Sequence, residues 1–392
     1  MSAVFQIFPR MIRPLILIGL VAFIHGVVCS QTKPEKDYLI YVVSESADKI
    51  ALVRFGPGGA RIDHQLDTGD MPVDIDGPHG IVISPDRQFY YVSIAHGRPF
   101  GTVWKYATKD DRVLAKTTLG YFPATVDITP DGNFLYVVNF NLHGDPVASS
   151  VSVVDTSVMM ELARIPTCVM PHGSRVTRDG ARQYSGCMMD DLLVEIDAQR
   201  MRVARSFRLG SGKEQGLSGL PPTKNGAVSA HTMSHENMAT TMNSATCQPT
   251  WAQPSVDGKR VYVACNKSDE IVEIDAEKWV VSRRVAAGNG VYNLGVTPDG
   301  KLLVATNKRG ASVSLFDLAT GTELTRLATK RKVVHGVAIS PDSRYAFVTV
   351  EGIGSEPGTI EVIDLAARKI VATVDTPPQA AGIDFWKTEA LR

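Results

Sequence analysis

From residue 38 to its end, the chain alternates apolar and polar positions with a period of two. That period is typical of β-strands with one buried face, and no segment of useful length shows the 3.6-residue period of a helix. The apolar stretches are short, rich in Val, Ile and Tyr, and separated by turns that contain Asp with Pro or Gly. The pattern predicts an all-β protein of many short strands.

The turns recur and define a repeat. Pro presets φ, Asp caps the turn with its side chain and Gly permits unusual backbone angles, so each turn is predicted to be a hairpin tip. A Tyr/Val-rich strand follows each tip, and then an alternating strand that closes on an acid, as in residues 151–155 and 193–197. The tips are Ser84-Pro85-Asp86-Arg87, Thr129-Pro130-Asp131-Gly132, Arg178-Asp179-Gly180, Val256-Asp257-Gly258, Thr297-Pro298-Asp299-Gly300 and Ser340-Pro341-Asp342-Ser343.

The spacing of the tips indicates the architecture. Successive turn aspartates are 45, 48, 78, 42 and 43 residues apart, and a period near 43 corresponds to one four-stranded propeller blade. The interval of 78 holds one blade and an insertion at about residues 210–246. Residues 38–67 lack a first strand, and residues 381–386 resemble one. Joining the two ends predicts a seven-bladed β-propeller whose ring is closed by N- and C-terminal strands in one blade, which removes open sheet edges.

The first thirty residues differ from the rest. Arg10 and Arg13 precede an apolar run over residues 14–28 and a small-residue exit at Ser30. This arrangement predicts a secretory signal peptide over residues 1–30, followed by a single domain over residues 31–392 in the periplasm or outside the cell. An uncleaved N-terminal anchor is the alternative. After cleavage no membrane span is expected, because the apolar run is shorter than a span requires.

Composition narrows the possible partners. The chain has 392 residues, with 41 basic and 41 acidic side chains, and removal of residues 1–30 leaves 39 basic side chains and a net charge of −2. These values exclude a coiled coil and a nucleic-acid binder driven by bulk charge. No phosphate-binding loop, dinucleotide fingerprint, zinc-protease helix or nucleophile elbow is present.

Through the tips at residues 129–132 and 297–300 and their Tyr-Val strands, the chain resembles the YVTN-repeat family of seven-bladed propellers. The resemblance covers roughly residues 38–390. It implies the fold but not one function, because that family includes surface proteins, DNA-associated periplasmic proteins and parts of redox enzymes.

Histidines gather on one predicted face. In a propeller blade the first strand runs along the central channel, and the residue seven places before each turn Asp is expected at the channel mouth. His96 and His143 fall in loops that open on the same face, as do His231 and His235 of the insertion; among the eight histidines after residue 30, only His64 does not. The residues at the mouth are His79, Ala124, His172, Thr250, Tyr292 and His335.

This distribution supports two interpretations. Neutral imidazole binds copper, iron and zinc, so His79, His172 and His335, with His143 as a further candidate, could form a metal site. In fold and in the three channel histidines the chain is similar to nitrous oxide reductase and to the haem-d nitrite reductase propeller, and its 139–145 loop to copper-dependent thiol oxidases. It has no cupredoxin domain and no haem attachment motif. The alternative is that the histidines hydrogen-bond neighbouring loops and that the adjacent Gly serves close packing.

The mature chain keeps four cysteines on the same face. Cys168 and Cys187 occupy positions around one hairpin that Cys247 and Cys265 repeat around the next. The parallel placement favours two within-blade disulfides, Cys168 with Cys187 and Cys247 with Cys265, in an exported protein. A thiolate–imidazole metal site, other pairings and free thiols remain alternatives.

Two functional hypotheses follow. The first, which we favour at this stage, is a binding or scaffold propeller whose His-rich channel face recognises a small-molecule ligand or a protein partner without a cofactor. The second is a periplasmic oxidoreductase that depends on copper or another transition metal at the channel mouth. Whether the protein is an enzyme stays open. The insertion is predicted to be a loop that covers the channel, or one whose His and Met residues supply soft ligands.

Overall fold

The computed structural model describes residues 1–2, 33–70, 74–96, 100–221 and 245–391. The chain divides into two units, Met1–Thr32 and Lys33–Arg392, and the second is the propeller. The predicted signal peptide lies outside the described residues except for its first two. So does most of the insertion, including His231 and His235. None of the described segments is a helix with the length and apolarity needed to cross a membrane.

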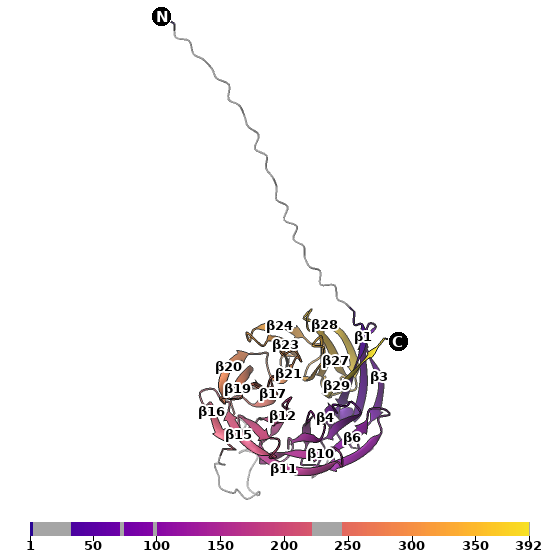
Figure 1. Cartoon of the computed structure of the whole chain (residues 1–392). Helices are drawn as coiled ribbons and strands as arrows, with labels where there is room; N and C mark the ends of the chain where they lie inside the picture. Colours follow the sequence, from indigo (N-terminus) through magenta and orange to yellow (C-terminus); the bar gives the residue numbers. More distant parts are fainter. Residues whose placement is uncertain (3–32, 71–73, 97–99, 222–244, 392) are drawn as a thin grey trace. The chain divides into compact units, whose positions relative to one another are not determined.

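Seven antiparallel sheets are arranged in a ring around a central channel, as the spacing of the tips predicts (Figure 1). In each sheet the innermost strand is the first one named below. The ring begins with β4 (Pro78–Ile83), β5 (Phe89–Ile94), β6 (Thr102–Ala107) and β7 (Val113–Thr118), then β8 (Pro123–Ile128), β9 (Phe134–Asn139), β10 (Ala148–Asp155) and β11 (Met160–Val169). The next sheets are β12 (Pro171–Val176), β13 (Arg182–Cys187), β14 (Leu192–Asp197), β15 (Arg202–Arg208) and β16 (Gln215–Ser218), then β17 (Pro249–Pro254), β18 (Arg260–Cys265), β19 (Glu270–Asp275) and β20 (Val280–Ala286). After them come β21 (Val291–Val296), β22 (Leu302–Asn307), β23 (Ser312–Asp317) and β24 (Glu323–Ala328), then β25 (Val334–Ile339), β26 (Tyr345–Val350), β27 (Gly358–Asp364) and β28 (Lys369–Thr376).

The seventh sheet is formed from both ends of the propeller, which confirms the predicted closure. Its order is β29 (Ala380–Ala390), β1 (Lys36–Ser44), β2 (Lys49–Gly56) and β3 (Gly59–Asp67). A short 3₁₀ helix, Glu45–Ala47, joins β1 to β2. The C-terminal strand thus supplies the innermost strand that the N-terminal segment lacks. The closing sheet packs against a neighbour on each of its faces, so the ring has no gap between a first and a last blade.

Hairpin tips are stabilised as the sequence suggests. The hydroxyl of Thr129 donates to the carboxylate of Asp131, whose other contacts include the backbone N–H of Asn133. Gly132 has φ of 77°, in the left-handed region that favours glycine. Equivalent hydroxyl–Asp bonds occur at the other tips, at Ser84, Thr177, Ser255, Thr297 and Ser340.

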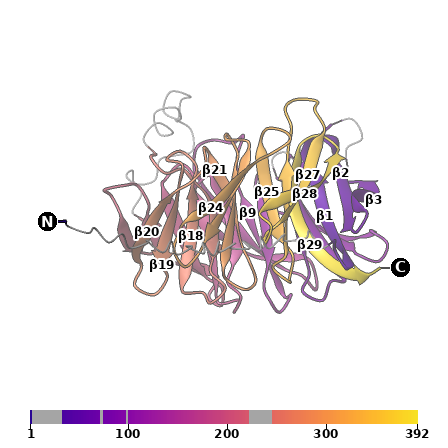
Figure 2. The same cartoon turned by 90° about the horizontal axis from the view of Figure 1, so that it is seen from above.

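The hydrophobic core is divided among the spaces between neighbouring sheets. One buried cluster joins Val82, Tyr91 and Val103 of the β4–β7 sheet to Val126 and Val137 of the β8–β11 sheet. Seen edge-on, the strands run between the two faces of the ring (Figure 2). Burial thus holds neighbouring sheets together pairwise and leaves the channel to be filled by side chains of the innermost strands.

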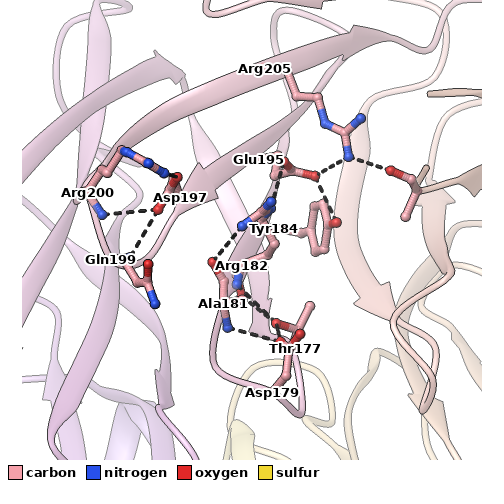
Figure 3. A network of polar contacts seen from close by, with 11 residues as sticks. Thr177, Asp179, Ala181, Arg182, Tyr184, Glu195, Asp197, Gln199, Arg200 and Arg205 are labelled. Carbon is pink, nitrogen blue, oxygen red and sulfur yellow. Dashed lines mark hydrogen bonds and ion pairs between the residues drawn. The ribbon is translucent and has the colours of Figure 1, made fainter. Parts of the chain in front are cut away.

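Buried acids also link strands within a sheet. The carboxylate of Glu195 on β14 accepts a hydrogen bond from the Tyr184 hydroxyl at 2.8 Å and is paired with Arg182 and Arg205 (Figure 3). The next sheet repeats the arrangement, with Glu273 between Arg260 and Arg283. Two cations and full hydrogen bonding compensate the cost of burying each carboxylate.

Both predicted disulfides form, Cys168 with Cys187 and Cys247 with Cys265. The thiolate metal site and free thiols are therefore excluded for these four residues. One detail differs from the expectation: Cys168 lies in β11, the outer strand of the preceding sheet, so its disulfide links two blades rather than one. The chain leaves β11 and enters β12 almost directly, which places Cys168 beside the end of β13.

We expected the insertion to be a loop, but part of it forms a strand. Its residues Gln215–Ser218 form β16, a fifth strand that pairs with β15. The hydroxyl of Ser206 on β15 donates to the carbonyl of Gly219 at 2.7 Å, which holds the end of this strand. The Gly- and Ser-rich composition of the insertion gave no indication of this strand, which has only four residues.

We predict that each disulfide contributes measurably to stability. Each closes a segment of about 20 residues, and the Cys168→Ala/Cys187→Ala double variant should lose about 2–4 kcal/mol of unfolding free energy through greater freedom of the unfolded chain. Urea unfolding followed by circular dichroism measures this, with Cys247→Ala/Cys265→Ala as the comparison. An unchanged unfolding midpoint in the first variant would contradict the prediction.

Candidate functional site

Four polar aromatic side chains meet in the channel. They come from the innermost strands β4, β12, β21 and β25. Ring centroids of His79 and His172 are 6.2 Å apart, those of His172 and Tyr292 5.3 Å, those of Tyr292 and His335 5.0 Å, and those of His335 and His79 5.4 Å. We call these four residues the channel quartet. The three histidines predicted to lie at the channel mouth are therefore brought together, with Tyr292 completing the set.

The quartet fits because the same position is small in the other three blades. Those positions carry Ala124 on β8, Thr250 on β17 and Ala381 on β29. The glycine after the channel residue is also required: a Cβ at Gly173 would lie 2.3 Å from the carbonyl oxygen of Thr250 in the next blade. Neighbouring innermost strands thus approach too closely for a side chain at that point, which accounts for the recurrent His-Gly pair.

His172 has one nitrogen committed to this strand contact. In several blades a hydroxyl on the second strand donates to the carbonyl of the next channel residue, as Thr306 donates to His335 at 2.9 Å. The second-strand position from which a hydroxyl would donate to the Thr250 carbonyl is occupied by Gly186, which has no side chain. His172 Nδ1 contacts this carbonyl oxygen instead, at 2.9 Å. Since a carbonyl only accepts, Nδ1 carries the proton. This contact is of the kind that the structural interpretation of the histidines expects.

The other nitrogen of His172 keeps a lone pair. Burial lowers the pKa of His172 to about 3, so the ring is neutral at physiological pH. With the proton on Nδ1, Nε2 accepts a hydrogen bond from the hydroxyl of Tyr292 at 3.0 Å. Burial raises the pKa of Tyr292 to about 12, so that hydroxyl keeps its proton.

Glu45 anchors two histidines. This residue lies in the 3₁₀ turn after β1, and its carboxylate contacts His79 Nδ1 at 2.8 Å and His96 Nε2 at 3.0 Å. Burial alone would raise the pKa of Glu45, but the two histidines hold it well below its usual range. The same contact raises the pKa of His96. Because the carboxylate only accepts, His79 carries a proton on Nδ1, and its Nε2 is the nitrogen left for another contact.

His335 is the least satisfied member of the quartet. Its ring is 5% exposed, and burial lowers its pKa well below the usual value, so it is neutral. Nε2 is 3.7 Å from Glu351 Oε1, too far for a hydrogen bond. Nδ1 is buried and has no hydrogen-bond partner among the described residues. A buried imidazole nitrogen without a partner costs free energy unless something else in the channel contacts it.

A cation lies beside the quartet. Lys308 Nζ is 4.3 Å from the centre of the Tyr292 ring and 2.9 Å from Glu351 Oε1. Burial would lower the pKa of Lys308, but Tyr292 and Glu351 raise it above its usual value, so the ammonium stays charged. Its charge also helps to keep His335 neutral.

The remaining candidate, His143, lies in the exposed loop after β9. Its ring is 5.5 Å from Phe122 and 6.4 Å from His96. Phe122 also contacts His79, at 5.8 Å. His143 thus belongs to a layer outside the quartet, together with His96 and Phe122.

The histidines of the quartet are typical metal ligands, but the distances between their rings are not all those of a formed metal site. As the side chains stand, no three or more of the described His, Cys, Asp and Glu residues are arranged to hold an ion. Two imidazoles on one ion have centroids roughly 5 Å apart, given metal–nitrogen bonds of about 2 Å. The observed 5.4 and 6.2 Å are near this value. His172 and His335 lie at opposite corners of the quartet, so side chains would have to move for all three rings to share an ion.

Beneath the quartet the channel holds a cavity of about 30 Å³. His79, His172 and His335 line one part of it, and Arg175, Trp251 and Asn293 line another. The guanidinium of Arg175 lies 4.5 Å from the centre of the Trp251 ring.

Glu45, Lys308 and Arg175 were missed by the sequence reasoning. Glu45 was discoverable, since it lies in a loop on the channel face just as His96 does. Arg175 follows His172 by three residues on an innermost strand and carries no motif that would distinguish it from a solvent-exposed strand residue.

Comparisons with known proteins show the fold and no closer relationship. No family model matches the sequence, so YVTN membership is not confirmed, and no curated protein matches it. Among solved structures, a chain of Kuenenia stuttgartiensis hydrazine synthase is similar with a TM-score of 0.60 and 20% identity, covering 81% of this chain and 92% of that one. A putative 6-phosphogluconolactonase from Bacteroides fragilis aligns with a TM-score of 0.66 and 15% identity, over 90% and 98%. The Pseudomonas aeruginosa periplasmic gluconolactonase PpgL gives 0.65 and 15%, over 90% and 99%.

The neutrality of His172 predicts a pH dependence of stability. An unfolded His binds a proton below about pH 6.5, whereas folded His172 does so only near pH 3, so protons favour the unfolded state. Between pH 7 and pH 5 this residue should reduce the unfolding free energy by about 2 kcal/mol. His172→Asn, which retains a donor near Thr250, should show a correspondingly shallower loss in urea unfolding. His143→Asn, in the exposed loop, is the control, and equal slopes in both variants and the parent would refute the prediction.

Proposed function

We propose that this exported propeller binds one transition-metal ion in its channel through His79, His172 and His335, with copper as the first candidate. The observation that carries the proposal is the unpartnered, buried Nδ1 of the neutral His335 within a closed set of polar aromatic rings. Such a nitrogen carries either a lone pair or a proton and has no protein partner. A metal ligand is in this state before its ion binds.

The outer contacts of the rings support this proposal. Histidines that bind metals usually donate their second N–H to a carboxylate or a backbone carbonyl. His79 Nδ1 contacts the Glu45 carboxylate and His172 Nδ1 contacts the Thr250 carbonyl. Nε2 of His79 is then left for an ion, and Nε2 of His172 would bind one in place of the Tyr292 hydroxyl. His335 turns Nε2 toward Glu351 at 3.7 Å and leaves Nδ1. Two of the three rings are thus held from outside by a hydrogen-bond acceptor, whereas Nε2 of His335 is too far from Glu351 for a hydrogen bond.

The electrostatics also suit an ion that prefers neutral nitrogen ligands. Burial keeps His172 and His335 neutral without competition from protons at pH 7. Imidazole with a nearby phenol suits copper, zinc or iron, and copper forms the most stable complexes of the divalent series. When bound, such an ion would supply Lewis acidity or electron transfer to a small molecule.

A scaffold role without a cofactor does not explain why the quartet is buried. A partner protein would contact exposed loops, whereas the quartet is buried: His172 is 1% exposed and Tyr292 8%. Export is part of the proposal and is supported by the two disulfides, which persist in oxidising compartments.

Metal analysis tests the proposal directly. Chain purified without chelator or nickel affinity, then loaded with Cu(II) or Zn(II) and desalted, should retain about one ion per chain by mass spectrometry. His335→Ala should abolish retention of the ion, because it removes the imidazole whose Nδ1 has no hydrogen-bond partner among the described residues. His64→Ala, on the outer rim beside Asp111, should retain the ion. Equal metal content in both variants, or none in the parent, overturns the proposal.

Glu45 is predicted to be a positioning residue for the ion. Glu45→Gln keeps the size of the side chain but removes the charge that orients His79, so metal affinity should fall by about 10–100-fold. Competition with a chromogenic chelator measures the change. Glu356→Gln, in an exposed loop, is the matched control, and equal affinity of the two variants would show that Glu45 does not act on the site.

A further inference from the structure

The cavity beneath the quartet contains more unsatisfied hydrogen-bonding capacity than its size suggests. Besides Nδ1 of His335, Nε1 of Trp251 and Oδ1 of Asn293 are buried without a hydrogen-bond partner among the described residues. All three residues line the same cavity and are at most 5% exposed. The Trp251 atom can only donate and the Asn293 atom can only accept. A donor and an acceptor without partners thus belong to side chains that line the cavity.

Buried polar atoms are rarely left unpaired, because each costs about 1–3 kcal/mol. Three of them around one cavity therefore indicate an occupant that hydrogen-bonds. A volume of about 30 Å³ exceeds the minimum of about 10–15 Å³ for one water molecule, but leaves room for only a few non-hydrogen atoms.

The charges of the channel favour a neutral occupant. On one side the ammonium of Lys308 is paired with Glu351 at 2.9 Å. On the other, Arg175 interacts electrostatically with the buried carboxyls of Asp127 and Asp384. Each cation thus has an acid nearby, Lys308 in an ion pair and Arg175 through its electrostatic interaction with the two carboxyls, and this weakens the attraction of either cation for an anion. The unpaired oxygen of Asn293 would also repel one.

We propose that this cavity is the binding site of a small neutral molecule of two or three non-hydrogen atoms that both donates and accepts hydrogen bonds, held by Trp251 Nε1 and Asn293 Oδ1. Its place beside the imidazoles makes it the natural position for a co-ligand or substrate of the proposed metal ion. Only this role rests on the proposed function; the binding site itself does not.

Glycines explain why the cavity exists. The position after the channel residue is Gly80 on β4, Gly336 on β25 and Gly382 on β29, and all three line the cavity. A Cβ at Gly80 would lie 2.2 Å from the Ala124 carbonyl oxygen. In the blades of Trp251 and Asn293 the same position carries these polar side chains, so at this level three blades present bare backbone to the cavity and these two present a polar group. Apolar side chains, among them Ile81 and Val337, complete the lining.

Formamide is the probe, because it is neutral, has three non-hydrogen atoms and carries both a donor and an acceptor. Formate has the same size but is an anion without a donor, and acetamide adds one carbon. Saturation-transfer NMR on the metal-free, full-length chain should show formamide binding with a Kd on the order of millimolar, which is what so few atoms allow. Formate and acetamide should each bind at least about tenfold more weakly.

Variants locate the site. Trp251→Phe removes the N–H and keeps an aromatic ring, and Asn293→Leu removes the acceptor at similar size. Each should weaken formamide binding about tenfold. Trp104→Phe is the matched control, because Trp104 Nε1 already donates to Thr102 on the same strand, β6. Circular dichroism establishes that each variant is folded.

The outcomes separate this inference from the metal proposal. Equal binding of formamide, formate and acetamide, or equal effects of Trp251→Phe and Trp104→Phe, overturns the small-molecule site and leaves the metal result untouched; in that case the cavity holds only water. Formamide binding by a chain that retains no metal overturns the metal proposal and supports the site.

Discussion

The close approach of seven innermost strands around one axis is the constraint on which the rest of this structure depends. A Cβ at Gly173 would be 2.3 Å from a carbonyl of the next blade, and a Cβ at Gly382 would be 2.5 Å from the carbonyl of His79. Where the strands approach most closely, four blades carry glycine after the channel residue, and the channel position itself carries a large side chain in four blades and a small one in three. Three small residues leave room for the four members of the channel quartet. Ring closure by β29 and β1 makes this constraint apply to all seven blades.

Burial by that ring determines the protonation of the site. Imidazoles in water would be partly charged near neutral pH, but His172 and His335 lose the stabilisation of a charged form when the surrounding strands exclude water. Glu45 offsets the same effect for His96, whose pKa it raises, and it also contacts His79. The result is a site with lone pairs available at neutral pH and with acids that hold the rings from outside. This is the physical basis of the proposed affinity for a transition metal.

The metal proposal and the cavity proposal concern adjacent parts of one channel. His335 belongs to both, because it is a proposed ligand of the ion and also lines the cavity beside Trp251 and Asn293. A rigid propeller suits such a site, since the innermost strands are held by pairing within each sheet and by packing between sheets. The structural neighbours include proteins named as a hydrazine synthase and as gluconolactonases, which shows how little the fold alone restricts chemistry.

The sequence by itself determined the local and periodic features: strands, hairpin tips, seven blades, ring closure, two disulfide pairings and the placement of His79, His172 and His335 at the channel mouth. These follow from alternation, turn chemistry and a repeat length, all of which are encoded in short stretches of chain. Only the tertiary structure decided which side chains meet. Glu45 lies 34 residues from His79, and Tyr292 lies 120 residues from His172, so neither contact has a signal in local sequence. The tautomers, the lowered pKa values and the unsatisfied atoms of the cavity arise from burial by strands of different blades, and burial of this kind is a property of the closed ring.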